Sequence, residues 1–290
     1  MSILVTGATG KLGSLVVEEL LKTVSADQLV VSVRDPGKAD ALRARGVTVR
    51  QADFNDPITL DAAFAGVERI LIISADGDND TRIRQHTNAV EAAARAGVKF
   101  IAYTSLANAA ESSNIMAPPH QATERAIKQT GIAYSFLRNN WYLENEASGI
   151  QGVLAGAPWV TAAGAGKTGW ALRRDYAAAA AAALTGHGHD FTTYELSGSL
   201  LTQDEFAAAL GAVIGKAVPV QHVDDNAYAD IMRGVGLPEF VIPIVVGIQQ
   251  SIRERSLEVE SNDFAKLLGR PATPVNEALA DIVRDITSAE

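Results

Sequence analysis

The sequence predicts an α/β protein built on a Rossmann-type, doubly wound parallel sheet, with a smaller and mostly helical C-terminal lobe. Three observations lead to this prediction. An apolar stretch at residues 3–5 runs directly into a glycine-rich turn and an amphipathic helix. Strand patterns then alternate with helical patterns, which implies right-handed crossovers and a ligand crevice at the carboxyl ends of the strands. Beyond residue 149 the composition changes to glycine, alanine and proline.

The first strand and the turn after it predict a dinucleotide site. Gly7 lets the backbone leave the strand tightly, Gly10 removes a side chain that would keep a pyrophosphate away, and Gly13 lets the helix at residues 11–23 lie close to the sheet. Backbone N–H groups at the positive end of that helix would meet the phosphates. The alternative is a tight strand-to-helix turn without a ligand. The predicted cofactor contacts in this turn are Gly7, Ala8, Thr9, Gly10, Lys11, Leu12 and Gly13.

The second strand, at residues 29–33, ends at the residue that selects the nicotinamide dinucleotide. Arg34 would bind the 2′-phosphate of NADP(H) through its forked guanidinium, and Lys38 would add positive charge one helical turn later. In the opposing interpretation, Asp35 accepts hydrogen bonds from the ribose of NAD(H) and Arg34 is a solvated surface charge. We expect NADP(H).

The third strand, at residues 47–50, leads to Asp53 and Phe54, where an adenine ring would rest, although Phe54 is also compatible with the core.

Apolar runs and helix stop signals place the later elements. Strands are expected at residues 69–74, 100–105, 132–137 and 194–197, and helices at residues 81–96, 120–130, 175–184 and 202–211. We interpret the seven alanines at residues 177–183 as a tightly packed helix rather than a disordered tract.

The expected elements divide the chain into two parts. We expect residues 1–150 to form the NAD(P)-binding domain and residues 160–200 to return to it. Residues 201–290, with a short strand near residues 218–220, are too few to bury a large core alone, so we expect a lobe that covers the crevice.

Composition excludes several classes of function. A net charge of −9 argues against nucleic-acid binding, which requires a basic surface. The absence of cysteine excludes disulfides and thiol catalysis, and it is compatible with a reducing compartment. The His187-Gly188-His189 pair has no third ligand nearby, so we expect a polar turn and no metal.

The same sequence gives no sign of export or membrane insertion. The first expected strand starts at Ile3, and the apolar run at residues 241–248 is short and is broken by Pro243. We therefore expect a cytoplasmic protein with no signal peptide and no membrane span. The oligomeric state is left open, and a homodimer is compatible with the sequence.

Several motifs together resemble the NmrA-like branch of atypical short-chain dehydrogenases. They are the stretch from Gly7 to Gly13, the Val33-Arg34-Asp35-Pro36 tip, and the segments at residues 98–105 and 136–142. The resemblance covers nearly the whole chain and is greatest to bacterial NAD(P)H:quinone oxidoreductases and triphenylmethane reductases of that branch. It implies NADPH on the glycine turn and on Arg34, and a planar electron acceptor under the C-terminal lobe. It also implies that the nicotinamide is flanked by Ser74 and Ala75 on one side and by the segment from Asn139 to Tyr142, including Trp141, on the other, and that Lys167 touches the cofactor. Thr104 is a further predicted cofactor contact.

The proton donor of ordinary short-chain dehydrogenases is missing. Those enzymes use a tyrosine followed four residues later by a lysine, and none of the eight lysines here has a tyrosine four residues before it. Where the resemblance would place that pair, the chain has His120 and Glu124, which would form either a proton-shuttling dyad or a partly exposed helix face that shapes the pocket. Tyr142 is a second catalytic candidate, although Trp141 and Tyr142 would equally stack on a ring or fill the core.

Three functions are compatible with this sequence. The leading hypothesis is an NADPH-dependent oxidoreductase that transfers hydride directly to a quinone, dye or enone, with solvent protonating the product. A second is a non-catalytic NADP(H) sensor, which the resemblance also implies. A third is a carbonyl or enone reductase that uses His120.

Overall fold

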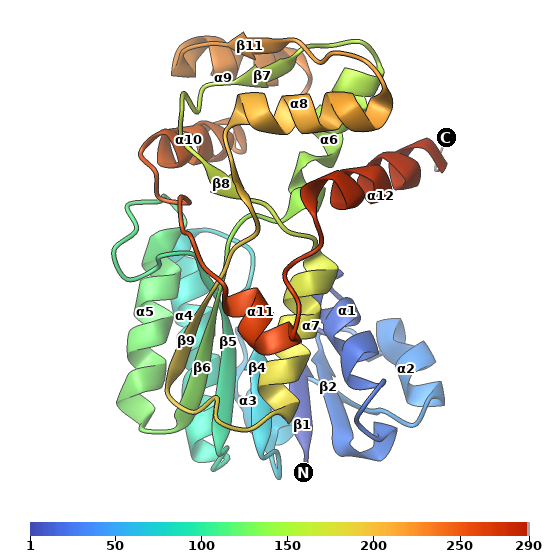
Figure 1. The fold of residues 1–290 in the computed structure, drawn as a ribbon. Helices are drawn as coiled ribbons and strands as arrows, with labels where there is room; N and C mark the ends of the chain where they lie inside the picture. The colour runs from blue at the N-terminus through green and yellow to red at the C-terminus, as the bar shows by residue number, and fades with distance from the viewer. Residues whose placement is uncertain (289–290) are drawn as a thin grey trace.

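The computed structural model describes residues 1–288 and has a central seven-stranded sheet with the strand order β3-β2-β1-β4-β5-β6-β9 (Figure 1). Every neighbouring pair in this sheet is parallel. The order runs outward in both directions from β1 and β4, as in a doubly wound fold, and confirms the predicted fold class. The strands are β1 Ile3–Thr6, β2 Leu29–Val33, β3 Thr48–Gln51, β4 Arg69–Ile72, β5 Phe100–Leu106, β6 Ala133–Asn139 and β9 Thr192–Leu196.

Helices cover both faces of the sheet because the strands are apolar on both sides. In β1, Ile3 and Val5 point to one hydrophobic cluster and Leu4 points to the other. The first cluster includes α1 Lys11–Leu20 and α7 Arg173–Thr185, and the second includes α3 Pro57–Phe64, α4 Asn79–Arg95 and α5 Ala117–Thr130. The short helix α2 Asp40–Ala44 and the 3₁₀ turns η1 Ala26–Gln28 and η2 Pro36–Ala39 complete the N-terminal half.

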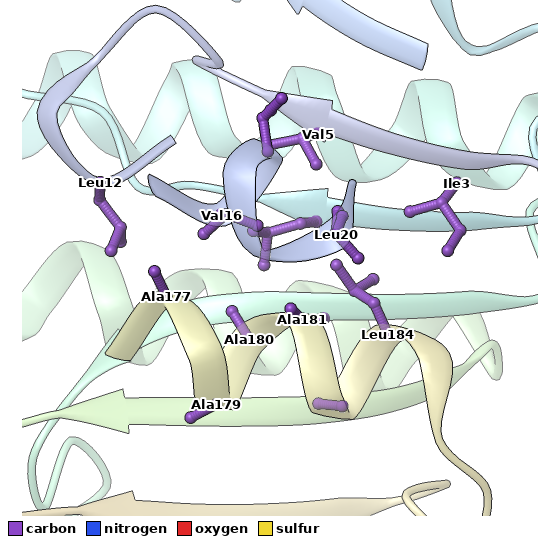
Figure 2. Close-up of a cluster of buried hydrophobic side chains, with 14 of the residues drawn as sticks. Ile3, Val5, Leu12, Val16, Leu20, Ala177, Ala179, Ala180, Ala181 and Leu184 are labelled. Carbon is purple, nitrogen blue, oxygen red and sulfur yellow. The ribbon is translucent and has the colours of Figure 1, made fainter. Parts of the chain in front are cut away.

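The alanine tract forms helix α7, which packs against α1. Figure 2 shows Ala177, Ala180 and Ala181 pointing toward Leu12, Val16 and Leu20 of α1. All of these side chains are buried. Alanine on this face allows two helices to lie close together over the same part of the sheet, as the sequence predicted.

The second lobe is built from segments that are far apart in the chain. Its two small sheets pair β7 Trp159–Thr161 with β11 Val220–His222, and β8 Thr168–Gly169 with β10 Leu200–Leu201. Its helices are α6 Ala147–Leu154, α8 Gln203–Ile214, α9 Asp225–Gly234, α10 Ile242–Arg253 and α12 Val275–Ser288, and α6 follows the 3₁₀ turn η3 Leu143–Glu146. No helix among residues 1–288 is long and apolar enough to cross a membrane.

The observed division of the chain differs from the expected one at two places. The return to the first domain comprises α7 and β9, whereas β7 and β8, within or next to the expected residues 160–200, pair with strands of the second lobe. Helix α11 Asp263–Leu268, expected in the lobe, packs against α7 and β9. Both differences arise from pairing between distant segments, which local patterns do not reveal.

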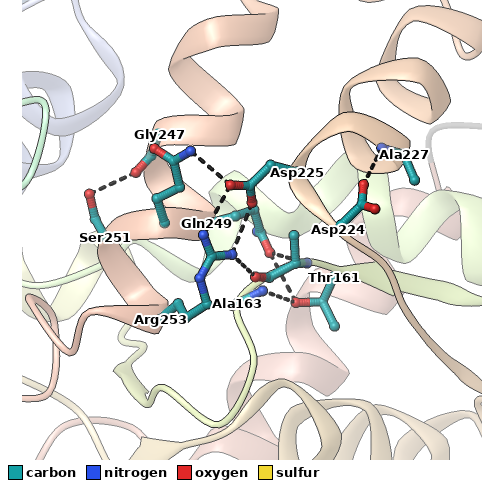
Figure 3. Close-up of polar contacts among 11 residues, drawn as sticks. Thr161, Ala163, Asp224, Asp225, Ala227, Gly247, Gln249, Ser251 and Arg253 are labelled. Carbon is teal, nitrogen blue, oxygen red and sulfur yellow. Dashed lines mark hydrogen bonds and ion pairs between the residues drawn. The ribbon is translucent and has the colours of Figure 1, made fainter.

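Polar contacts hold α9 and α10 of the second lobe against the end of β7 (Figure 3). The Arg253 guanidinium pairs with the Asp225 carboxylate at 2.9 and 3.0 Å and donates to the Ala162 carbonyl. Gln249 Oε1 accepts from Thr161 Oγ1 and from the Ala162 N–H, each at 2.9 Å. These bonds pair the Thr161 hydroxyl and the backbone of Ala162, at the end of β7, and they fix α9 and α10 relative to β7.

Candidate functional site

The predicted crevice lies where β1 and β4 end beside each other. In an open α/β sheet this reversal of strand order is the usual ligand site. The two loops are joined directly, because the Ile73 N–H donates to Thr6 Oγ1 at 2.9 Å. A Cβ built on Gly7 would lie 3.9 Å from the Ile73 Cβ, so the glycine turn and the loop after β4 form neighbouring walls.

The glycine turn has the geometry of a phosphate cradle. Gly7 has a φ of +60°, which favours glycine, and its carbonyl accepts from the Gly10 N–H at 2.9 Å. A Cβ on Gly13 would lie 2.2 Å from the Gly7 oxygen, so only glycine permits this helix to start so close to the strand. No side chain caps α1, its first turn carries no acidic residue, and Thr9 and Lys11 are exposed. The backbone N–H groups there are available to an anion.

The end of β2 leaves a positive side chain available. Arg34 and Lys38 are exposed, and neither side chain has a hydrogen-bond or ion-pair partner among the described residues. Asp35, the rival ribose ligand, accepts a hydrogen bond from the Gly37 N–H at 3.1 Å and caps η2. The arrangement suits a 2′-phosphate better than a bare ribose.

Asp53 and Phe54 follow β3 and are both half-buried. Asp53 Oδ1 accepts from the N–H and the side-chain amide of Asn55, at 2.8 and 3.1 Å. Phe54 packs against the edge of the second cluster while retaining some exposure. Its packing supports the core interpretation, and its contact with adenine remains a prediction.

Side chains from three different elements hold the loop after β4. The Ser74 N–H donates to Thr104 Oγ1 on β5, and the Ala75 N–H donates to His86 Nε2 on α4, each at 2.9 Å. Ser74 and Ala75 are themselves only partly buried, so they remain accessible from the crevice. Thr104 is therefore placed behind this loop.

Asn139 ends β6 and Tyr142 follows it, at the same carboxyl edge of the sheet as the loop after β4. Asn139 is only 5% exposed and donates from Nδ2 to the Tyr142 hydroxyl at 2.9 Å. Its Oδ1 is buried and has no hydrogen-bond partner among residues 1–288. A buried acceptor without a donor is costly, and the carboxamide of a nicotinamide is a donor of the required kind. The orphaned oxygen and the glycine cradle thus both fit a nicotinamide dinucleotide.

Tyr142 is held as a neutral phenol. Burial raises its pKa, and the hydrogen bond from Asn139 only partly offsets this effect. Its ring meets Tyr176 edge-on, with centroids 5.0 Å apart, and the Arg173 guanidinium lies over its face. Trp141 turns toward the second lobe, where its indole N–H donates to Glu146 at 2.9 Å.

His120 and Glu124 make no hydrogen bond to each other and bond instead to different partners. Each is only 4% exposed, so the prediction of a partly exposed helix face is wrong. His120 contacts Arg82 and Tyr103, each at 2.9 Å, whereas Glu124 accepts from Ser105 at 2.7 Å. Glu124 also forms a two-pronged ion pair with Arg138. Burial and the nearby Arg82 guanidinium hold the pKa of His120 well below its ordinary value, which keeps the ring neutral.

Two other predicted positions lie outside this edge of the sheet. Lys167 is in the turn before β8 in the second lobe, and its charge contributes to the lowered pKa of Glu205, after the hydrogen bond with Thr202. Its contact with a cofactor remains a prediction. His189 bonds to the Tyr194 hydroxyl at 2.7 Å, and no group of three potential metal ligands occurs in the described part of the chain.

Buried polar residues that the sequence did not predict support the loops of the site. Arg82 and His86 are four residues apart on α4, and both are buried. Glu146 receives the indole N–H groups of both Trp141 and Trp170, and burial raises its pKa. The available signal was a pair of polar residues on the otherwise apolar stripe of α4.

Two surface hollows lie away from the crevice. One, of about 690 Å³, is lined by α8 and the segment leading to β11, including Asp204 and Lys216. The other, of about 400 Å³, lies beside Arg174 and Arg270. Neither contains a residue of the predicted site, so the crevice is identified by its geometry and not by its volume.

Known proteins resemble this chain over nearly its whole length. Quinone oxidoreductase 2 of Escherichia coli K12 is 42% identical over 281 residues, which cover 97% of this chain and 98% of that protein. The NAD(P)H azoreductase of Xenophilus azovorans is 30% identical over 93% of this chain and 94% of its own. The crystal structure of Citrobacter sp. triphenylmethane reductase complexed with NADP(H) superposes with a TM-score of 0.93 at 41% identity, covering 97% of this chain and 100% of that one.

The match to a family model agrees with these likenesses. Residues 1–257 match the model of the NmrA-like family, which includes the glycine turn, the tip of β2 and both walls of the crevice. The predicted resemblance is therefore confirmed, and the chain belongs to the NmrA-like family.

Proposed function

We propose that this protein is an NADPH-dependent oxidoreductase that transfers hydride to a quinone or a similar conjugated acceptor. The observation that carries the proposal is the glycine cradle at the β1–β4 junction with the available Arg34 beside it. It occurs in a chain 42% identical to a quinone oxidoreductase and 30% identical to an azoreductase. Quinones and azo compounds share a conjugated, electron-poor system, and this shared chemistry defines the substrate class.

The residues present fit NADPH. The turn from Gly7 to Gly13 would hold the diphosphate, and Arg34 with Lys38 would hold the 2′-phosphate. Asn139 Oδ1 would accept a hydrogen bond from the carboxamide of the nicotinamide, and the Ser74–Ala75 loop would flank the ring. When bound, NADPH supplies the hydride, and the protein contributes position and exclusion of water.

Among residues 1–288, neither His120 nor Glu124 is free to act as a proton donor at this edge. Both ring nitrogens of His120 are engaged, and Glu124 is committed to Arg138 and Ser105. This geometry disfavours a carbonyl reductase that uses His120. A reduced quinone carries an oxyanion of modest basicity that water can protonate, so hydride delivery is the step that the protein must organise. The Tyr142 hydroxyl accepts a hydrogen bond from Asn139 Nδ2. This neutral phenol would orient the carboxamide or the acceptor.

The experiment combines binding with turnover. Calorimetry with purified protein should give tighter binding of NADPH than of NADH, by tenfold or more for a charge-assisted phosphate contact worth about 1.5–3 kcal/mol. NADPH oxidation should then be observed with members of a panel of quinones, azo dyes, triarylmethane dyes and enones. Binding of NADPH without oxidation by any acceptor would indicate a sensor, and the absence of binding would refute both readings.

We also propose that the protein works in the cytoplasm and that its acceptors are small and planar. A chain without cysteine does not depend on an oxidising compartment for disulfides, which supports the first point. Cell fractionation tests the location. Light scattering of the purified protein tests the expectation of a homodimer.

A further inference from the structure

The backbone of the loop after β4 is fixed by hydrogen bonds to buried side chains. Three successive N–H groups, those of Ile73, Ser74 and Ala75, each donate to a buried side chain at 2.9 Å. The acceptors come from three elements, Thr6 of β1, Thr104 of β5 and His86 of α4. The Ala75 carbonyl in turn accepts from Arg82 Nε at 2.8 Å, so α4 holds both polar backbone atoms of Ala75.

A second layer of side chains fixes the two α4 residues that hold Ala75. Arg82 also donates to His120 Nε2 at 2.9 Å, and His120 Nδ1 lies 2.9 Å from the Tyr103 hydroxyl. Because arginine only donates, a neutral His120 must carry its proton on Nδ1 and donate it to Tyr103. His86 accepts from Ala75 on Nε2, so its Nδ1 donates to Thr123 Oγ1 at 2.8 Å.

This network is buried, although most of its members are polar or charged. His86 and Tyr103 are fully buried, and Arg82, His120 and Thr123 are nearly so. Burying a guanidinium and two imidazoles costs desolvation free energy that apolar side chains would not incur. What the network achieves is a fixed backbone at one point, the partly exposed Ser74–Ala75 segment that follows β4.

We propose that Arg82 and His86 are positioning residues that hold the Ser74–Ala75 backbone as a rigid wall for the nicotinamide half of NADPH. This inference rests on the proposed function. It also gives a structural role to the two α5 residues at the positions of the tyrosine and lysine of ordinary short-chain dehydrogenases. His120 supports the wall through Arg82, and Glu124 bonds to Ser105 and Arg138. The residues of this network touch the loop and not the reacting atoms, so they act through geometry.

The test separates the two halves of the cofactor. His86→Leu removes the acceptor for the Ala75 N–H, whereas His86→Gln can present an amide oxygen near the same place. Val90→Ala on the same helix is the matched control, because Val90 is buried in the apolar cluster and takes no part in the network. Each variant is titrated by calorimetry with NADPH and with adenosine 2′,5′-bisphosphate, which lacks the nicotinamide, and its quinone reduction is measured at saturating NADPH.

His86→Leu should lose about tenfold in NADPH affinity and at least as much in the rate at saturation, with adenosine bisphosphate affinity within about twofold of wild type. His86→Gln should recover most of the loss, and Val90→Ala should behave as wild type. Equal weakening of both ligands, or wild-type behaviour of His86→Leu, would overturn the inference. If His86→Leu does not fold, the isosteric Thr104→Val carries the same test at Ser74. Failure of wild type to bind NADPH would instead refute the proposed function itself.

Discussion

At Gly13 the absence of a side chain sets how closely α1 approaches the turn. The atoms that a Cβ would meet are backbone atoms of Gly7 and Ala8, which cannot rotate away. Gly13→Ala should therefore shift the start of α1, destabilise the protein by about 1–3 kcal/mol and weaken NADPH binding. Thermal unfolding and calorimetry measure the two effects.

Gly152→Ala is the control for Gly13→Ala. A Cβ at Gly152 in α6 would meet only the Ala157 Cβ, at 3.9 Å, and alanine favours a helix. This substitution should leave binding unchanged and stability equal or slightly higher. Normal NADPH binding by Gly13→Ala would contradict the cradle.

Arg34 is the residue on which the choice of cofactor depends. Arg34→Gln should lower NADPH affinity by tenfold or more and leave NADH affinity nearly unchanged, because a charge-assisted bond to phosphate contributes about 1.5–3 kcal/mol. The measurement is calorimetric titration with each dinucleotide. Arg45→Gln, which removes a surface arginine paired with Glu18, controls for the loss of charge. Equal losses for both dinucleotides would refute a phosphate contact.

At the scale of elements, the contact between α1 and α7 depends on small side chains. Ala180 is buried on the face that meets Val16 and Leu20, so Ala180→Leu should force the helices apart and cost about 1–3 kcal/mol. Ala178 on the same helix is only partly buried, and Ala178→Leu should cost less than half as much. Urea unfolding of both variants provides the comparison. Equal stability would mean that the close approach is not required.

Elements were predictable where the signal was local. Runs of apolar and aromatic residues located the strands of the central sheet to within a few residues. The expected start of α8 at Thr202 coincides with a capping box that Thr202 forms with Glu205. The predicted start of α5 at residue 120 is three residues late, because Pro118 and Pro119 lie inside the first turn of the helix. Proline lacks the N–H that a first turn leaves unpaired, so α5 begins at Ala117 and includes both prolines.

The supporting residues of the site were not predictable in the same way. The glycine turn and Asn139 lie at strand ends, which sequence patterns locate. His120 was identified from its position, but its role depends on Arg82 and Tyr103, from two other elements. Which face of α4 is buried, and what meets it, is decided only when α5 packs beside it.

At the scale of the whole molecule, the buried histidines make stability depend on pH. Burial and then the Arg82 charge lower the pKa of His86 to about 3, and the pKa of His120 also lies well below its ordinary value near 6.5. Between about pH 6.5 and 3 the unfolded chain therefore binds protons that the folded chain does not. Stability should fall as pH drops through this window, by up to about 1.4 kcal/mol per pH unit for each histidine, and these groups should have no effect above it.

Urea unfolding at a series of pH values tests this dependence. Carboxylates also titrate in this range, so the informative quantity is the difference between variants. His86→Gln should reduce the slope between pH 6 and 4, whereas Val90→Ala, which removes no titratable group, should leave it unchanged. Parallel curves for wild type and His86→Gln would contradict the assignment of a neutral buried ring.

The path of the chain between the lobes has a consequence for folding. The polypeptide leaves the central sheet after β6, returns for α7 and β9, leaves again, and comes back for α11 before ending in α12 (Figure 1). Each lobe is therefore made of several separate segments of the chain, and neither can be completed during synthesis before most of the chain has been made. Calorimetric melting should accordingly give one cooperative endotherm rather than two. A truncation that removes the second lobe should also unfold the nucleotide-binding domain.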